Sequence, residues 1–245
     1  MTAAAAAASS AAAALPVVDL RSFDSVEDLA ADLMRVGKDP GFFYVVGHDL
    51  RDDVAADMFA LAETFFSSPL EEKLAYANGS GDLGYTDDAP TSHSEDIRAG
   101  AHSDYGSLTL LFRQPSDQGG LQVLRGGGGD NNAVAWADVP CIPDAVVVNI
   151  GDALEFWTAG RLRSTVHRVA FPRSASENVA RLSIPVFIQP DRHVVLAPIK
   201  EDRKDGGGAD AEFLEVLRRK GYESAEPVTS LEHLKRRIRA TYGKV

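Results

Sequence analysis

Hydrophobic and polar positions follow two different periods along the chain, and the change falls near residue 100. Before it, apolar residues recur every three to four positions, which is the spacing of a helix with one buried face. Ser25 is placed to cap one such helix, with Gly37 as its expected end, and a second helix is expected over Asp53–Ser67. Ser68-Pro69 is typical of a third helix start, and the aromatic and β-branched run Phe42–Val46 predicts a strand. The apolar face of the second helix consists of Val54, Met58, Leu61 and Phe65.

From residue 100 to residue 197 the pattern changes to short apolar runs separated by turn residues. Runs of this kind at this spacing favour a β-sandwich or jelly roll. The last segment returns to a helical pattern, in which Ser230 caps a helix over Leu231–Tyr242. We therefore expect a mainly β fold with flanking helices. The expected strands cover residues 108–112, 121–124, 134–137, 146–150, 165–169, 182–188 and 194–196.

Shifts in composition divide the chain into four regions. These are an alanine-rich, disordered tail (1–14), a helical N-terminal region (15–90), the β core (91–200) and a C-terminal helical segment (201–245). Two glycine-rich runs, at 126–132 and 204–208, are expected to be loops. The tail lacks the basic residues of a secretory signal, so we expect a cytoplasmic protein, with an organelle signal as the alternative.

Charge and cysteine usage narrow the possible chemistry. The chain has 25 Lys and Arg against 36 Asp and Glu, which gives a net charge of −11. This balance argues against nucleic acids and anionic membranes as partners, because both need clustered basic residues. The single cysteine, Cys141, excludes a disulfide framework within the chain and cysteine-based zinc or iron–sulfur sites. A metal would therefore have to bind to His, Asp or Glu.

Two histidines and one aspartate are the candidate metal ligands. His102 and Asp104 lie two positions apart, so on an extended chain their side chains point to the same side. The pair alone is weak evidence for a metal site, because His93-Ser94-Glu95 fits the same pattern. His167 lies on an expected strand, where a core histidine is the simpler interpretation. Together, however, two histidines and one carboxylate form the facial triad of non-haem Fe(II) oxygenases.

Arg181 and Ser183 are a second pair of polar residues two positions apart on an expected strand. A guanidinium and a hydroxyl that point together suit a carboxylate ligand, because arginine binds it with two parallel hydrogen bonds. The alternative is a surface arginine on an edge strand, but the residues that follow are strongly apolar. The pair is therefore a candidate site for an anionic co-substrate.

The remaining candidates carry less weight. Tyr105 and Phe187 are candidates for a substrate pocket, whereas His193 and His233 are expected at the surface. The basic residues from Lys235 to Arg239 are expected to form a helix face that is solvated or paired within the molecule.

These segments resemble, in order, the motifs of the Fe(II)- and 2-oxoglutarate-dependent dioxygenases of the isopenicillin N synthase-like family. Several independent motifs in the same order argue against a chance match. The resemblance implies a double-stranded β-helix core, a cupin-like jelly roll, with N-terminal helices packed on it. The matching segments are residues 102–111, 119–123, 146–152 and 157–161, His167, Arg181-x-Ser183 and, upstream, 15–20, 41–48 and 65–73.

The resemblance also implies an activity. The protein would oxidise, and more specifically hydroxylate, a small organic molecule with release of succinate and CO2. Fe(II) would be held by His102, Asp104 and His167, and 2-oxoglutarate by Arg181 and Ser183. O2 would be the oxidant and ascorbate an additional reductant, with no catalytic residue beyond the metal ligands. We expect a monomer whose partner is the small-molecule substrate.

The chain departs from the family in one place. Family members have a long stretch before the metal segment, including a strand that begins the core and often gives a Tyr or Asn to 2-oxoglutarate. Only residues 84–101 fill that stretch here, and no strand of that type is visible. We therefore expect a core that is incomplete at its first strand, or one in which residues near Asp96-Ile97-Arg98 take its place poorly. Two alternatives stay open: an Fe(II) oxidase that does not use 2-oxoglutarate, and a truncated or non-catalytic metal-binding relative.

Overall fold

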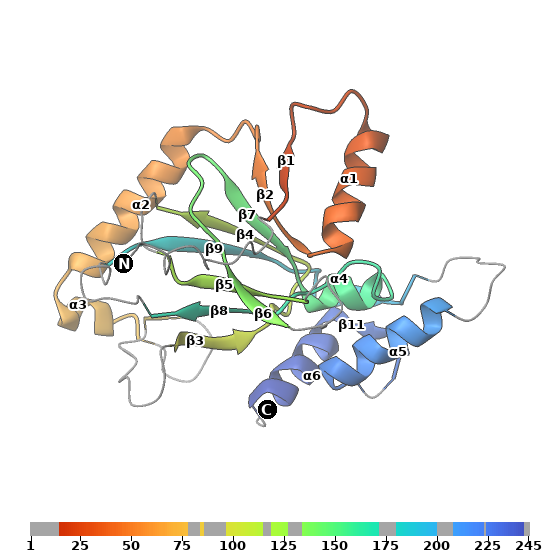
Figure 1. The fold of residues 1–245 in the computed structure, drawn as a ribbon. Coiled ribbons are helices and arrows are strands. Elements are labelled where there is room, and N and C mark those ends of the chain that lie inside the picture. Colours follow the sequence, from red (N-terminus) through yellow and green to blue (C-terminus); the bar gives the residue numbers. More distant parts are fainter. Residues whose placement is uncertain are drawn as a thin grey trace, which may run out of the picture.

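The protein is described by a computed structural model, which covers residues 15–77, 84–85, 97–114, 119–126, 134–171, 180–199, 208–222 and 224–242. It contains two main sheets with helices around them (Figure 1). The strands of the five-stranded sheet are, in spatial order, β1 (Val17–Asp19), β2 (Phe42–Val46), β7 (Val146–Ile150), β4 (Leu108–Arg113) and β9 (Ser183–Ile188). Those of the four-stranded sheet are β3 (Ile97–His102), β8 (His167–Ala170), β5 (Leu121–Arg125) and β6 (Ala135–Asp138). The short strands β10 (Val195–Leu196) and β11 (Val228–Thr229) form a separate ladder.

The helices lie around the two sheets on more than one side (Figure 1). They are α1 (Val26–Lys38), α2 (Asp52–Ser67), α3 (Leu70–Leu74), α4 (Asp152–Trp157), α5 (Gly208–Lys220) and α6 (Ser230–Tyr242). In the described part of the chain, no helix is both long and apolar enough to span a membrane. The expected tail, most of both glycine-rich runs, His93 and Glu95 lie outside the described residues.

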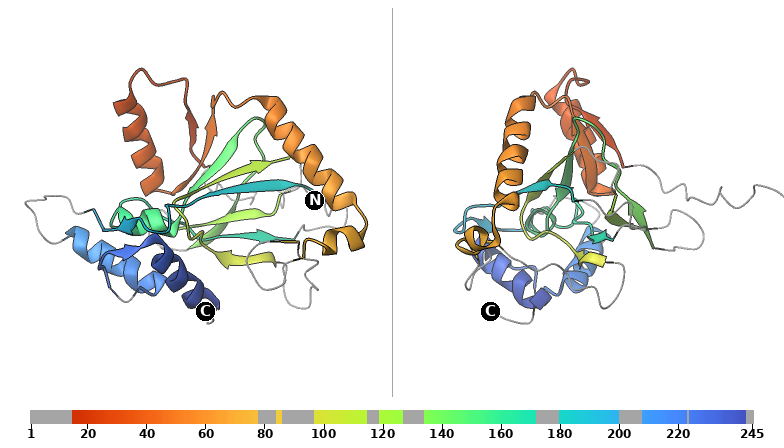
Figure 2. Two further views of the ribbon diagram at one scale, coloured as in Figure 1. Left: turned by 180° about the vertical axis from the view of Figure 1, so that it is seen from behind. Right: turned by 90° about the vertical axis from the view of Figure 1, so that its left-hand side faces the viewer.

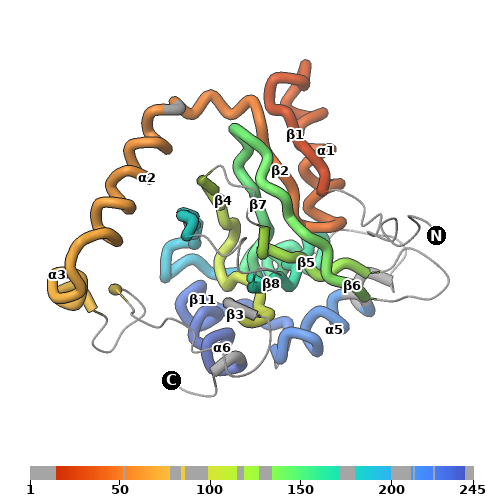
Figure 3. The backbone as a smooth tube through the Cα atoms, turned by 60° about the vertical axis from the view of Figure 1, so that its left-hand side comes forward, coloured from red at the N-terminus to blue at the C-terminus, as the bar shows by residue number. Residues whose placement is uncertain are grey.

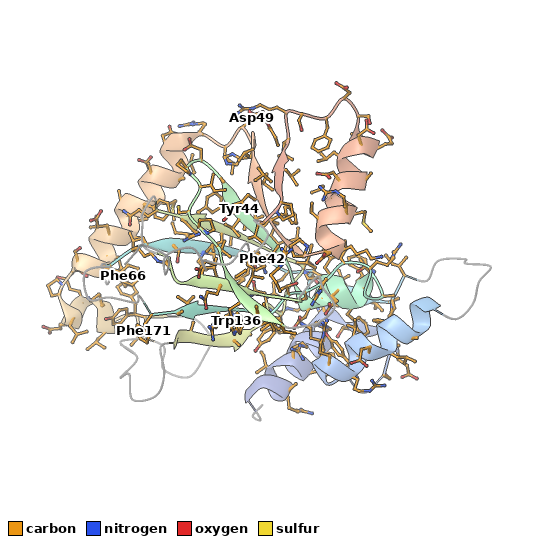
Figure 4. All side chains as sticks on the ribbon, viewed as in Figure 1. Phe42, Tyr44, Asp49, Phe66, Trp136 and Phe171 are labelled. Atoms are coloured by element: carbon orange, nitrogen blue, oxygen red, sulfur yellow. The ribbon has the colours of Figure 1, made fainter. Side chains whose placement is uncertain are left out.

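The core lies between the two sheets, where the inner faces of β2 and β7 pack against those of β5 and β6. Phe42 and Tyr44 of β2 point into this layer (Figure 4) and are 1% and 2% exposed. On the outer face of the larger sheet, α1 covers a second cluster that contains Val18, Phe43 and Val148. The predicted strands therefore form, each within two residues of its expected ends, because their alternating apolar positions fill these two layers.

The end of α1 differs from the sequence-based expectation. Ser25 caps the helix as predicted, by accepting a hydrogen bond from the Asp28 N–H, but the helix continues through Gly37 to Lys38. Gly37 is buried, and a Cβ there would lie 2.7 Å from Leu162 Cδ2, so glycine permits close packing at this position. Pro40 limits the helix instead, because the residue before a proline is disfavoured in the helical conformation.

The stretch before the metal segment contains a strand that the sequence pattern missed. β3 spans Ile97–His102 and pairs with β8 through two register shifts. It does not extend the larger sheet, in which β9 pairs only with β4 among the described strands. That arrangement is consistent with a core that is incomplete at its first strand, and the described strands do not close into a barrel.

The helices differ in how deeply they pack. The expected apolar face of α2 forms, but Val54, Met58 and Leu61 are 54%, 47% and 62% exposed, and α2 stands apart from the sheets (Figure 3). In contrast, α4, α5 and α6 gather at one end of the sheets (Figure 2) around Phe156, Phe213 and other apolar residues. The expectation of a surface position for His233 is wrong, because α6 buries this residue to 1% exposure against Phe156.

Candidate metal centre

The three predicted ligands lie together where β3 and β8 run side by side. His102 at the end of β3 is the ladder partner of His167 at the start of β8, and their rings are 4.4 Å apart. Asp104 follows β3 by two residues. Its Oδ1 lies 3.8 Å from His102 Nε2 and 3.6 Å from His167 Nε2. One donor atom from each residue falls within 4.8 Å of the others, and this is the only such group among the described residues.

The hydrogen bonds of both imidazoles fix which nitrogen is available to a metal. His102 Nδ1 lies 2.7 Å from the Gly100 carbonyl oxygen, and His167 Nδ1 lies 3.2 Å from that of Thr165. A carbonyl oxygen can only accept, so each Nδ1 carries the proton and each Nε2 presents a lone pair. Metal-bound histidines are oriented in this way, by a hydrogen bond from the other ring nitrogen.

The carboxylate of Asp104 is held through one oxygen only. Oδ2 accepts hydrogen bonds from Thr109 Oγ1 at 2.5 Å and from Asn149 Nδ2 at 2.8 Å. Thr109 and Asn149 are partners in the β4–β7 ladder, so their side chains lie on the same face of the sheet. Oδ1 is left facing the two Nε2 atoms. The structure thus places three donor atoms in positions that suit metal bonds of about 2.0–2.2 Å after small side-chain movements.

Burial also favours the ligating form of His167. The residue is 8% exposed and its ring packs edge-on against Phe42 at 5.4 Å. Desolvation lowers the pKa of the His167 imidazole, although the Asp104 carboxylate acts in the opposite direction. The ring is therefore neutral at physiological pH, which is the form that binds metals. His102, with 40% of its side chain exposed, marks the open side of the group.

Arg181 and Ser183 lie at the far end of β9 from this group. The inner face of β9 carries Ser183 and Phe187, because Phe187 is the ladder partner of Thr109 and residues two apart share a face. Phe187 is 57% exposed, Ser183 is exposed and Arg181 is half-buried. The row from Ser183 to Phe187 therefore leads along an open surface to the carboxylate of Asp104.

Tyr105 lies close to the C-terminal helices. Its ring centroid is 5.9 Å from the guanidinium of Arg237 on α6. The assignment of Tyr105 and Phe187 to a substrate pocket stays a prediction.

Sequence reasoning did not find the residues that support the ligands. Asn149 is 3% exposed within the otherwise apolar strand β7, and a polar residue in such a strand is a usable signal. Asp152, whose backbone N–H donates to the Asp104 carbonyl oxygen, accepts hydrogen bonds from Lys220 and Arg237. No local pattern indicates these two contacts, because Lys220 and Arg237 lie 68 and 85 residues further along the chain. The basic face of the last helix was expected to be either solvated or paired within the molecule. Arg237 on this helix is paired, with Asp152.

Two packed sheets that carry a His-Asp-His group, in which Asp104 and His167 are buried, are typical of non-haem metal proteins of the double-stranded β-helix class. The profile of the 2OG-Fe(II) oxygenase superfamily matches residues 83–190, and that of the N-terminal region of non-haem dioxygenases in morphine synthesis matches residues 15–118. Together the two profiles span residues 15–190, which is more than half of the chain, and they assign it to the 2OG-Fe(II) oxygenases, whose cofactor and co-substrate are Fe(II) and 2-oxoglutarate.

Two curated relatives match part of the chain. A UPF0676 protein of Schizosaccharomyces pombe is 40% identical over 152 residues, which are 61% of this chain and 39% of that protein. A bi-functional coumaroyl CoA and feruloyl CoA ortho-hydroxylase of Ipomoea batatas is 39% identical over 105 residues, which are 43% of this chain and 26% of that enzyme. The chain thus spans well under half the length of these curated relatives.

Solved structures confirm the expected fold class. A full-length Neurospora crassa protein, crystallised in complex with alpha-KG and 5-formyluracil, superposes with a TM-score of 0.68 at 22% identity. The superposition covers 92% of this chain and 96% of the Neurospora chain. A dioxygenase for auxin oxidation in rice superposes with a TM-score of 0.64 at 19% identity, over 94% of this chain and 96% of that one.

Proposed function

We propose that the chain is an Fe(II)- and 2-oxoglutarate-dependent oxygenase that oxidises a small organic molecule and releases succinate and CO2. The observation that carries this proposal is that one donor atom each of His102, Asp104 and His167 lies within 4.8 Å of the others, with Asp104 Oδ1 3.8 Å and 3.6 Å from the two Nε2 atoms. Two imidazoles and one carboxylate are the donor set of a facial triad, which leaves coordination positions open.

His102, Asp104 and His167 would hold the iron, and the groups behind them would keep its ligands in place. Thr109 and Asn149 fix Oδ2 of Asp104 and so aim Oδ1 at the metal position. One carboxylate and two neutral imidazoles leave a divalent ion with a net charge of about +1, which favours an anionic co-substrate. When bound, the iron with 2-oxoglutarate and O2 supplies the oxidising chemistry of the family.

Arg181 and Ser183 would bind the carboxylate of 2-oxoglutarate that lies farther from the metal. Arg181 precedes β9 and Ser183 is its first residue. Ser183 lies on the inner face of β9, as does Phe187, the ladder partner of Thr109. A guanidinium forms two parallel hydrogen bonds with a carboxylate, and a hydroxyl adds a third. Phe187 would then present an exposed aromatic surface to the substrate at the other end of the same row.

The substrate is proposed only as a small organic molecule. Among the similar proteins, one is named for hydroxylation of coumaroyl and feruloyl CoA, and the Neurospora crassa protein was crystallised with 5-formyluracil. We propose that the chain acts on such a molecule as a monomer in the cytoplasm, without nucleic acid or membrane partners.

The test is turnover of 2-oxoglutarate by the Fe(II)-loaded protein in air. We expect succinate to form, slowly without substrate and faster with the correct one, and we expect His167→Ala to abolish it. Oxygen uptake on another organic acid with 2-oxoglutarate unconsumed would favour an Fe(II) oxidase. Fe(II) binding without any oxygen uptake would favour the non-catalytic alternative.

A further inference from the structure

Asp152, the first residue of α4, has a buried carboxylate that joins four parts of the chain. Its side chain is 0% exposed. Oδ1 accepts hydrogen bonds from Ser164 Oγ at 2.6 Å and from Lys220 Nζ at 2.6 Å. Oδ2 accepts from Arg237 Nε at 2.7 Å and from Ser103 Oγ at 3.2 Å. We call these five residues, Asp152, Ser103, Ser164, Lys220 and Arg237, the Asp152 network.

The Asp152 network contains one buried carboxylate and two buried cations, which stabilise one another's charged forms. The side chains of Lys220 and Arg237 are only 4% and 9% exposed, so both cations are buried beside the carboxylate. Burial by itself raises the pKa of Asp152, but Lys220 and Arg237 outweigh it and keep the pKa below its ordinary value. Removal of the Arg237 side chain would leave Oδ2 of Asp152 with only the Ser103 hydrogen bond among those described, and a buried carboxylate that loses a charged partner is strongly destabilised.

The network touches both chain segments that carry candidate metal ligands. Ser103 lies between His102 and Asp104, and its Oγ also accepts a hydrogen bond from Lys220 Nζ at 2.8 Å. Ser164 lies three residues before His167. Its backbone N–H donates to Glu155 Oε1 of α4 at 3.0 Å. One segment follows β3 and the other precedes β8, and the Asp152 carboxylate accepts a hydrogen bond from a serine of each.

The cations of the network come from the C-terminal helices. Lys220 is the last residue of α5 and Arg237 lies in α6. Arg237 Nη1 also donates to the backbone oxygen of Lys220, so the two helices are joined at this point. The C-terminal helices, which contribute no ligand of their own, thus contact the segments that follow β3 and precede β8 through the Asp152 network.

We propose that Asp152, held by Lys220 and Arg237, is a positioning residue for the metal centre, so that the C-terminal helices hold the ligand-bearing segments after β3 and before β8 in place. This inference rests on the proposed Fe(II) site. Groups that orient metal ligands typically affect metal affinity by about 10- to 100-fold when they are removed.

The experiment titrates the whole chain with Co(II), whose visible absorption reports the ligand geometry. We expect wild type to bind one Co(II). Arg237→Met should weaken binding by about tenfold or more and alter the visible bands. Arg237→Lys, which keeps the charge, should recover part of the affinity. Ser103→Ala is a milder variant that removes only the hydroxyl link, and it should weaken binding less.

Two control variants separate positioning from general stability. Arg236→Met removes the neighbouring, more exposed arginine, which pairs with Glu232, and should bind Co(II) like wild type. Leu217→Ala removes apolar packing from α5 and should lower the thermal midpoint without changing the Co(II) spectrum of the folded protein.

Two results would overturn the inference. One is wild-type Co(II) affinity and spectrum in folded Arg237→Met; the other is an equal loss of affinity in Leu217→Ala at equal stability. These outcomes differ from failure of the proposed function, in which the wild-type protein itself would bind no Co(II).

Discussion

The backbone N–H of Asp152 donates a hydrogen bond of 2.7 Å to the carbonyl oxygen of Asp104. The start of α4 is thereby joined to the candidate ligand from behind, while Thr109 and Asn149 hold the Asp104 side chain from the sheet. The metal-facing oxygen is thus fixed by both main-chain and side-chain contacts. A site of this kind is sensitive to groups that never touch the metal.

Thr109→Val tests the support of the Asp104 carboxylate. Valine has nearly the same shape but lacks the Oγ1 donor, so Oδ2 keeps only the Asn149 hydrogen bond among those described. We expect the dissociation constant for Fe(II), measured anaerobically, to rise about tenfold. Thr158→Val is the matched control, because Thr158 is also buried but donates to the Leu154 carbonyl oxygen within α4. Equal affinities in both variants would contradict this role of Thr109.

Gly151→Ala tests the close approach of α4 to the metal segment. A Cβ at Gly151 would lie 2.2 Å from the Gly106 carbonyl oxygen, so one of the two backbones must move. We expect a loss of about 1–3 kcal/mol in the free energy of unfolding, measured with urea, because the contact is overpacked. Gly119→Ala is the control, since a Cβ there meets nothing within 4 Å. Similar stabilities for the two variants would show that this contact is not restrictive.

His233 should make stability depend on pH. Burial lowers the pKa of His233 to about 4. The Asp152 carboxylate raises this pKa and the Arg237 guanidinium lowers it further. Between the ordinary pKa of about 6.5 and this value, the unfolded chain binds a proton that the folded chain does not. The free energy of unfolding should therefore fall as the pH falls through this range, by roughly 3 kcal/mol at most from this residue.

Urea unfolding of His233→Gln at pH 7.5 and pH 4.5 measures this contribution. The variant should lose less stability than wild type between the two pH values, because its side chain cannot take up the proton. His193→Gln, which replaces an exposed histidine, should retain the wild-type dependence. Identical pH profiles for wild type and His233→Gln would contradict the assignment.

Arg181→Ala tests the proposed co-substrate contact. Loss of a charge-assisted, two-fold hydrogen bond costs about 1.5–3 kcal/mol, so we expect 2-oxoglutarate to bind at least tenfold more weakly to the Fe(II)-loaded protein. Affinity for Fe(II) alone should not change, since Arg181 is not a proposed ligand. Arg192→Ala, at an exposed position, is the control. Unchanged 2-oxoglutarate affinity in Arg181→Ala would remove this residue from the site.

Much of the fold could be predicted because its signals are local. The run Phe42–Val46 forms β2 and Val146–Ile150 forms β7, both at the expected limits, since each is apolar on both sides and both of its faces are covered. β3 was missed because Arg98 and Gly100 interrupt the pattern of apolar residues that marks a strand. Its pairing with β8 is irregular as well, with two register shifts. The ligand pair His102 and Asp104 was visible through its spacing.

The support behind the ligands could not be predicted, because it depends on pairing over long distances. α6 buries His233 and Arg237, four positions apart, so the buried face of this helix carries polar residues. A pattern of apolar positions assigns such a face to solvent. Only the packing of α6 on α4 shows that Arg237 meets Asp152 there.

The most direct test of the central claim is an anaerobic Fe(II) titration of wild type and His167→Ala, followed by addition of 2-oxoglutarate. We predict that wild type binds one Fe(II) and develops a visible charge-transfer band with 2-oxoglutarate, and that His167→Ala does neither. Full Fe(II) affinity in His167→Ala, or a wild-type protein that binds no Fe(II), would contradict the assignment of His102, Asp104 and His167 as the metal ligands.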